Sequence, residues 1–285
     1  MSAALPAAAA LADAAARLRA AGVPEAVADA RRLLAHALAI APERLTLALS
    51  EPLPEAAAAR FAAFVAARAA RQPVAQITGE RLFWGRTFQV TPDVLDPRPE
   101  TETLVATALE APFSRVLDLG TGSGCLLLTL LADRPGATGL GTDISATALA
   151  VAARNAARLG LGARAAFALA DWFSGVDGAF DLIVANPPYI AAGELAALAP
   201  EVRNWEPRAA LTPGEDGLAA YRAIAAGATA HLAPAGRLIL ETGAGQGAAV
   251  AALCEAAGLG HAMLRADMDG RARAVLCMLP PPARF

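Results

Sequence analysis

The segment Val116-Leu117-Asp118-Leu119-Gly120-Thr121-Gly122-Ser123-Gly124 is a short apolar run that leads directly into a glycine-rich loop. The next nine residues, 125–133, continue as an apolar helical pattern, so the loop joins the end of a strand to the start of a helix. Glycine accepts backbone dihedrals that other residues avoid and lets a ligand approach without interference from a Cβ atom. The segment therefore predicts a ligand-binding loop at the carboxyl edge of an α/β sheet.

Short apolar runs alternate with helical patterns along the rest of this region. This alternation predicts an α/β fold with a mostly parallel sheet and helices on both faces. The predicted strands are 115–119, 138–142, 164–169, 180–185, 237–241, 261–265 and 274–278, and the predicted helices are 125–133, 146–159, 217–231 and 245–257.

The part of the chain before the sheet divides into two segments. Residues 1–75 are rich in Ala, Leu and Arg with helical periodicity, which predicts a small helical bundle. Residues 76–96 contain two candidate strands, 76–82 and 87–90, around Phe83-Trp84-Gly85-Arg86, and predict a β-hairpin linker. The sheet domain then occupies residues 97–285, and a chain of 285 residues suits one large and one small domain.

Composition limits the class of protein. The chain is 56% hydrophobic, but much of this is Ala, and no uncharged run reaches the ~18 residues that span a bilayer. The formal net charge of -3 creates no general attraction for nucleic acid. The three cysteines are far apart, which suits a reducing compartment, and no Cys/His spacing resembles a metal site. We expect a cytoplasmic protein that does not bind the membrane and holds no metal.

The spacing of the glycines indicates the class of ligand. A dinucleotide fingerprint would read Gly-x-Gly-x-x-Gly, but here Gly124 comes one position early and Cys125 stands at the expected place. The pattern, preceded by Asp118, resembles the first motif of the class I S-adenosylmethionine-dependent methyltransferases. Asp143 ends the next predicted strand about 20 residues later, where a carboxylate can accept hydrogen bonds from ribose hydroxyls. Asp143 alone does not separate NAD from S-adenosylmethionine.

Two further segments follow strands of the same predicted sheet. In the class I methyltransferase pattern, which this region resembles, the residues after the third strand flank the adenine. Asp171 could then accept a hydrogen bond from the adenine amine and Trp172 could cover the ring. After the fourth comes Asn186-Pro187-Pro188-Tyr189, whose prolines remove two N–H donors and leave a stiff, acceptor-rich loop. The Asn186 side-chain oxygen and the Pro187 carbonyl could hold a planar NH2 group under the Tyr189 ring. Because a sulfonium already activates its methyl group, positioning of the nitrogen would be the main task.

Several other segments extend this likeness over most of the chain, which resembles the release-factor glutamine methyltransferases of the PrmC/HemK type. The Asn-Pro-Pro-Tyr loop also occurs in adenine-N6 DNA methyltransferases and in the ribosomal-protein glutamine methyltransferase, so the loop by itself specifies only a planar amine. The segments that favour the release-factor branch are 97–102 (PRPETE), 171–173 (DWF), 206–211 (EPRAAL) and 214–218 (GEDGL).

The resemblance implies the reaction. The substrate would be the Gln of the Gly-Gly-Gln motif in peptide chain release factors, methylated at its side-chain nitrogen, with residues 1–75 helping to dock the release factor. A ribosomal-protein glutamine methyltransferase and an adenine-N6 nucleic-acid methyltransferase remain alternatives, although we expect no stable binding of nucleic acid. An NAD-dependent oxidoreductase is disfavoured by Cys125 and by the Asn-Pro-Pro-Tyr loop.

Each site residue has an expected role. Asn186, Pro187 and Tyr189 are the expected catalytic residues, and with Pro188 they form the expected substrate loop. The expected cofactor-binding residues are Asp118, Gly120, Thr121, Gly122, Ser123, Gly124, Asp143, Asp171, Trp172 and Asn186. The segment Pro97 to Glu102 has two interpretations: Thr101 caps the following helix, or the segment lines the cofactor or peptide-entry side.

Overall fold

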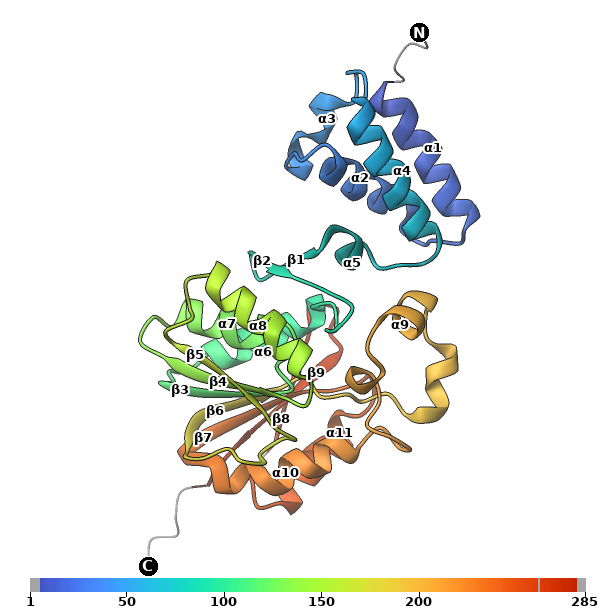
Figure 1. Cartoon of the computed structure of the whole chain (residues 1–285). Coiled ribbons are helices and arrows are strands. Elements are labelled where there is room, and N and C mark those ends of the chain that lie inside the picture. Colours follow the sequence, from blue (N-terminus) through green and yellow to red (C-terminus); the bar gives the residue numbers. More distant parts are fainter. Residues whose placement is uncertain (1–5, 261, 281–285) are drawn as a thin grey trace, which may run out of the picture. The chain divides into compact units, whose positions relative to one another are not determined.

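The computed structural model describes residues 6–260 and 262–280 and divides the chain into two compact units. The first unit contains the chain up to Gly79 together with Ala199–Trp205. The second contains Glu80–Leu198 and the chain from Glu206 onward (Figure 1). The first unit therefore includes residues 199–205, which follow four strands of the sheet in sequence. The sequence did not indicate this.

The first unit is helical. Apolar residues from its helices pack into one core in which Leu18, Leu33 and Leu34 are fully buried. Three of its helices start directly after a proline, where the missing N–H has no intrahelical partner to lose. Its helices are α1 (Ala7–Ala20), α2 (Ala26–Ala37), α3 (Leu45–Ala48), α4 (Glu55–Ala69), α5 (Val74–Thr78) and α9 (Pro200–Trp205).

A buried cluster of charges holds α9 in this unit. Arg68 of α4 donates to Asp29 Oδ2 over 2.8 Å and to Glu201 Oε1 over 2.9 Å. Arg71 donates to Glu201 Oε2 over 2.7 Å. Burial opposes ionisation of Glu201, but the hydrogen bonds from Arg71 and Arg68 lower its pKa below the usual value. Gln76 Nε2 adds a 2.8 Å hydrogen bond to the Trp205 carbonyl.

The second unit contains a hairpin and a seven-stranded sheet (Figure 1). The hairpin strands are β1 (Glu80–Phe83) and β2 (Arg86–Gln89). The sheet order is β5-β4-β3-β6-β7-β9-β8, in which β5 to β7 run parallel and β9 pairs antiparallel with both β7 and β8. The strands are β3 (Arg115–Leu119), β4 (Thr138–Asp143), β5 (Ala165–Leu169), β6 (Phe180–Ala185), β7 (Leu232–Glu241), β8 (Met263–Ala266) and β9 (Ala272–Met278).

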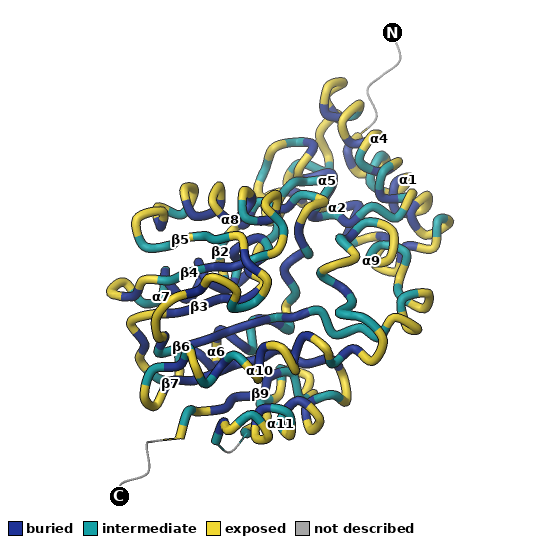
Figure 2. The backbone as a smooth tube through the Cα atoms, turned by 60° about the horizontal axis from the view of Figure 1, so that its bottom comes forward, coloured by how far each residue is buried: buried dark blue, intermediate teal, exposed yellow. Residues whose placement is uncertain are grey.

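Helices cover both faces of this sheet, as the sequence predicted. Successive residues of β3 face opposite ways: Val116 packs with one apolar cluster, and Leu117 and Leu119 pack with the other. The first cluster includes residues of α6 (Glu102–Leu109), α7 (Cys125–Asp133) and α8 (Ala146–Arg158). The second includes residues of α10 (Ala219–His231) and α11 (Gly247–Ala256). Figure 2 shows β3 and β6 largely buried, whereas the outward turns of α8 are exposed.

Some predicted boundaries were wrong. Gln76 to Thr78 do not begin a strand, because Gln76 and Ile77 both donate backbone hydrogen bonds to the Pro73 carbonyl and form the helical turn α5. Strand β7 begins at Leu232, five residues before the predicted start, and its pairing with β6 shifts register between Phe180 and Leu182. Strand β8 lies at 263–266, and His261 of the predicted strand lies outside the described residues.

Replacing Arg68 by Ala is expected to destabilise the first unit. Among the described residues, Asp29 would keep only the exposed Arg32, at 3.4 Å, as a partner for its buried carboxylate. Loss of one partner from a buried ion pair costs on the order of 3 kcal/mol. Denaturant unfolding measures this change. Arg17→Ala, which removes a surface pair with Asp13 at 3.9 Å, is the control, and it should change the unfolding free energy by less than about 1 kcal/mol. Equal losses in both variants would contradict the expectation.

Replacing Thr129 by Val is expected to stabilise the second unit. Thr129 is fully buried in α7, and its hydroxyl makes no hydrogen bond with any residue in the described ranges. Val keeps the shape and removes the desolvated hydroxyl, so the unfolding free energy should rise by about 1 kcal/mol. The matched control is Thr107→Val in α6, whose hydroxyl donates to the Thr103 carbonyl over 2.8 Å and should therefore give no gain. Thermal and denaturant unfolding of both variants check this, and a less stable Thr129→Val would count against it.

Candidate functional site

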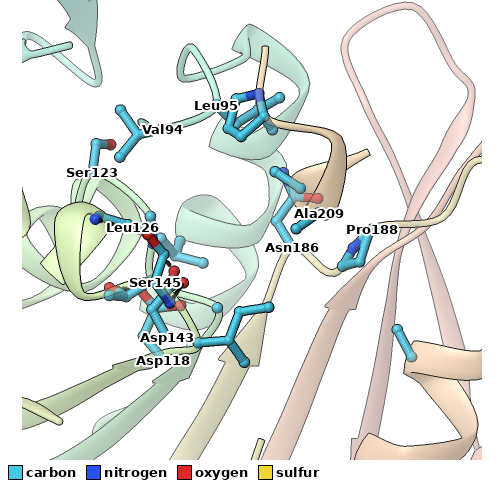
Figure 3. Close-up of a pocket in the computed structure, with 18 of the residues that line it drawn as sticks. Val94, Leu95, Asp118, Ser123, Leu126, Asp143, Ser145, Asn186, Pro188 and Ala209 are labelled. Atoms are coloured by element: carbon cyan, nitrogen blue, oxygen red, sulfur yellow. Dashed lines mark hydrogen bonds between the residues drawn. The ribbon is translucent and has the colours of Figure 1, made fainter. Parts of the chain in front are cut away.

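A cavity of about 590 Å³ lies in the second unit where β3, β4 and β6 end. Figure 3 shows Ser123, Asp143 and Ser145 on one side of this cavity and Asn186, Pro188 and Ala209 on the other. Its volume falls in the ~300–1,000 Å³ range of small-molecule sites. The predicted site residues that line it are Asp118, Gly120, Thr121, Gly122, Ser123, Asp143, Asp171, Trp172, Asn186 and Pro188.

The glycine loop has the conformation that its sequence demands. Gly120, Gly122 and Gly124 all have positive φ, at 70°, 54° and 77°, which L-residues rarely adopt. Gly124 does not line the cavity: a Cβ at this position would lie 3.1 Å from the Ala152 Cβ of α8. This third glycine therefore allows the loop to pack closely against a helix.

Asp118 holds the glycine loop through hydrogen bonds. Its Oδ2 accepts a hydrogen bond from Thr121 Oγ1 over 2.7 Å and a longer one from the Leu127 N–H over 3.3 Å. Burial raises the pKa of Asp118 to about 7, although both hydrogen bonds act in the opposite direction. Asp118 thus links the end of β3 to the loop and to the first turn of α7.

Asp143 ties β4 to the same loop. Its Oδ2 accepts from the Gly122 N–H and its Oδ1 from the Ser145 N–H, both over 2.9 Å. Ser145 is the N-cap residue of α8, and its hydroxyl accepts from the Ala148 N–H. Each carboxylate oxygen of Asp143 keeps a further lone pair, and the residue lines the cavity, so it can still accept hydrogen bonds from a ligand.

Apolar side chains line the part of the cavity next to Asp143. Trp172 has a positive φ of 49°, and its carbonyl accepts a hydrogen bond from Thr142 Oγ1 over 3.4 Å. Ile144 is exposed, which is unusual for a large aliphatic side chain, and it too lines the cavity. Sequence reasoning missed Ile144, although it directly follows Asp143.

The loop Asn186-Pro187-Pro188-Tyr189 borders two cavities. Asn186 and Pro188 line the first, whereas Tyr189 lines a second, more polar cavity of about 320 Å³ with Arg98, Pro99, Glu100, Glu241 and Arg273. Arg98 lines both. A group bound in the second cavity would therefore lie next to the loop that also borders the first.

The far end of this loop is held by Gln246. Its Nε2 donates to the Tyr189 carbonyl over 2.9 Å, and its Oε1 accepts from the Gly243 N–H over 3.1 Å. Tyr221, fully buried, donates its hydroxyl to the Glu241 carbonyl over 3.0 Å. Sequence reasoning missed both residues, since Gln246 is 57 residues from Tyr189 and Tyr221 is 20 residues from Glu241 along the chain.

The segment Pro97 to Glu102 lies at the site, and its threonine is not a helix cap. Thr101 makes no side-chain capping hydrogen bond. Its hydroxyl instead donates to Glu241 Oε2 over 2.6 Å and accepts from Asn186 Nδ2 over 3.1 Å. Arg98 donates to Glu206 Oε1 over 2.6 Å, which joins this segment to residues 206–211. The segment thus lines the two cavities, and its place on the cofactor or peptide-entry side stays a prediction.

Comparison with known proteins gives two family models. The PrmC N-terminal domain matches residues 9–79, and the methyltransferase small domain matches residues 95–202. No helix among residues 6–260 and 262–280 has the length and apolar character needed to cross a membrane.

Two solved structures are similar to this chain in fold. A methyltransferase from Pyrococcus furiosus has a TM-score of 0.53 at 15% identity and covers 70% of this chain and 91% of its own. The 16S rRNA N2 G1207 methyltransferase of Thermus thermophilus, solved with AdoMet and guanosine, has a TM-score of 0.50 at 21% identity and covers 70% and 49%. At these identities the likeness establishes the fold alone.

Curated relatives are much more similar in sequence. The release factor glutamine methyltransferase of Cereibacter sphaeroides is 66% identical over 264 residues, which cover 93% of this chain and 95% of the relative. The protein of the same name from Rhodospirillum rubrum is 49% identical and covers 91% and 81%. With a relative this similar over nearly its whole length, the chain belongs to the release factor glutamine methyltransferase family.

Proposed function

We propose that this protein transfers the methyl group of S-adenosylmethionine to the side-chain nitrogen of the Gln in the Gly-Gly-Gln motif of peptide chain release factors. The observation that carries the proposal is the place of Asn186, on the border of a nucleoside-sized cavity, in a chain of this family. S-adenosylmethionine is the methyl donor, and it supplies a methyl group already activated by the sulfonium.

The first cavity fits the cofactor. Asp143 retains acceptor capacity for ribose hydroxyls, and the backbone of Gly120 to Gly124 offers close approach. Asp171 is the proposed acceptor for the adenine amine, with Trp172 and Ile144 as apolar neighbours of the ring. Asp118 acts through the loop that it supports, together with Thr121. Ser123 lines the same wall.

The Asn-Pro-Pro-Tyr loop is the proposed site of the acceptor amide. An amide nitrogen is a weak nucleophile because its lone pair is delocalised. Acceptors aimed at its hydrogens, the Asn186 oxygen and the Pro187 carbonyl, stabilise the positive charge that develops on nitrogen as the bond forms. Pro188 stiffens the loop and Tyr189 covers the planar group. Burial raises the pKa of Tyr189 to about 12, so its hydroxyl stays neutral at physiological pH.

The helical bundle, expected from the sequence at residues 1–75, is the proposed docking element for the release factor, residues 76–96 the linker, and 97–285 the catalytic domain. The reaction takes place in the cytoplasm, where release factors work. The net charge of -3 favours a protein substrate without stable binding of nucleic acid.

The acceptor can be identified by label transfer. Purified protein is incubated with methyl-labelled S-adenosylmethionine and one of three acceptors: a release factor, the same factor with the Gln of Gly-Gly-Gln replaced by Ala, or unmethylated duplex DNA. We expect label in the first acceptor only, and mass spectrometry should place it on that Gln. Label in DNA alone would instead identify an adenine-N6 methyltransferase and overturn the proposal.

Asn186→Ala separates catalysis from cofactor binding. Loss of the aimed acceptor should lower kcat by at least ~10²-fold, as loss of one preorganised polar group does in other enzymes. Binding of S-adenosylhomocysteine, measured by titration calorimetry, should change little because the nucleoside wall of the cavity is untouched. Full turnover in this variant would refute the aiming role of Asn186.

A further inference from the structure

We infer that Thr101 and Glu241 are positioning residues that fix which end of the Asn186 carboxamide faces the methyl acceptor. The inference rests on the proposed function, because it concerns the same site. It assigns a task to a threonine and a glutamate that lie outside the Asn-Pro-Pro-Tyr loop.

The problem that these residues solve is one of symmetry. The oxygen and the NH2 of a carboxamide are nearly equal in shape, so packing alone does not choose between the two orientations. In one orientation Asn186 presents an acceptor to the substrate NH2. In the other it presents a second NH2, and two donors face each other. Only the first orientation aims the nucleophile.

The hydrogen bonds select the first orientation. A threonine hydroxyl has one hydrogen, and Thr101 gives it to Glu241 Oε2 over 2.6 Å. Thr101 therefore has only lone pairs left for Asn186, which must turn its NH2 toward Thr101, at 3.1 Å. The Asn186 oxygen then points away, and it accepts no hydrogen bond from any described residue. It is available to the substrate.

Burial makes the selection firm. Thr101 is 3% exposed and Glu241 is 1% exposed, so each side chain has little access to water that could replace its partner. Burial raises the pKa of Glu241 to about 7, while the hydrogen bond from Thr101 and the charges of Arg273 and Arg98 act against this rise. Glu100 adds to it, and Tyr189 and Cys125 also lie within the field of Glu241. The Thr101 hydrogen bond thus favours the ionised form of Glu241, in which the carboxylate can only accept.

The first test removes the hydroxyl. Thr101→Val keeps the shape of the side chain but cannot accept from Asn186. We expect kcat on release factor to fall by about tenfold or more, with KM and cofactor affinity changed by less than about twofold, since the lost contact aims an acceptor without binding either substrate. Thr101→Ser, which restores the hydroxyl, should recover most of kcat. Thr107→Val, a buried threonine of α6 with an intrahelical partner, is the matched control and should retain full kcat.

The second test reverses the direction of the hydrogen bond between Thr101 and residue 241. Gln at position 241 can donate its NH2 to Thr101, which frees the Thr101 hydrogen to face the Asn186 oxygen and favours the wrong orientation. Glu241→Gln should therefore lower kcat. Because Thr101 and Glu241 both act through Asn186, the variant that combines Thr101→Val with Glu241→Gln should be no slower than the slower of the two single variants.

A readout without turnover makes the inference independent of the substrate. The side-chain amide signal of Asn186 in a ¹⁵N spectrum, assigned by its loss in Asn186→Ala, should shift in Thr101→Val and stay in place in Thr107→Val. If wild-type protein labels no release factor, the proposed function fails and this signal still decides the inference. If wild-type protein is active, full kcat in a folded Thr101→Val, an unshifted Asn186 signal, or an equal loss of kcat in Thr107→Val overturns the inference.

Discussion

The parallel, in-register pairing of β3 with β6 is the constraint on which the site depends. Leu119 of β3 lies opposite Ala185 of β6, so the glycine loop and the Asn-Pro-Pro-Tyr loop start from adjacent positions at one edge of the sheet. Adjacent strands are about 4.8 Å apart. On the other side of β3, Leu119 pairs with Thr142, which brings Asp143 to the same edge. A shift of one residue in either pairing would turn every side chain of that strand to the opposite face.

The parts of the site that depend on local chain conformation could be predicted from the sequence. The glycines at 120, 122 and 124 signal their own backbone geometry, and β3 and α7 have the predicted boundaries. The partner of a hydroxyl is a different matter. Thr101 precedes a helix, which locally favours a cap, but its partners Glu241 and Asn186 are 140 and 85 residues away in sequence. No local pattern reports on such contacts.

The same limit explains the missing part of the bundle. Glu201 is separated from Arg68 by 133 residues, and α9 is a helix of only six residues between loop segments. The helix propensity of these six residues does not indicate which unit the helix packs in. The buried, oppositely charged Arg68 is what assigns it to the first unit, and this became visible only with the tertiary structure.

Three buried carboxyls, Asp118, Glu206 and Glu241, have pKa values raised by burial to about 7. Because each pKa lies above that of the unfolded chain, these groups favour the folded state most at a pH below the ordinary carboxyl range. This contribution to stability is lost as the pH rises through about 7. At neutral pH the three carboxyls therefore lower the free energy of unfolding, but they provide hydrogen-bond acceptors beside the cavities. Such buried acids concentrate where proteins place function.

Because α9 returns to the first unit after the chain has formed most of the sheet, neither unit is one continuous stretch of polypeptide. A gene fragment that ends at Gly79 encodes a bundle without the partner of Arg71, and a fragment that starts at Glu80 carries Glu201 without either arginine. An exchange of bundles between relatives must therefore carry residues 199–205 along with the N-terminal helices. Recombination at a single crossover would mismatch the two halves of one buried ion-pair network.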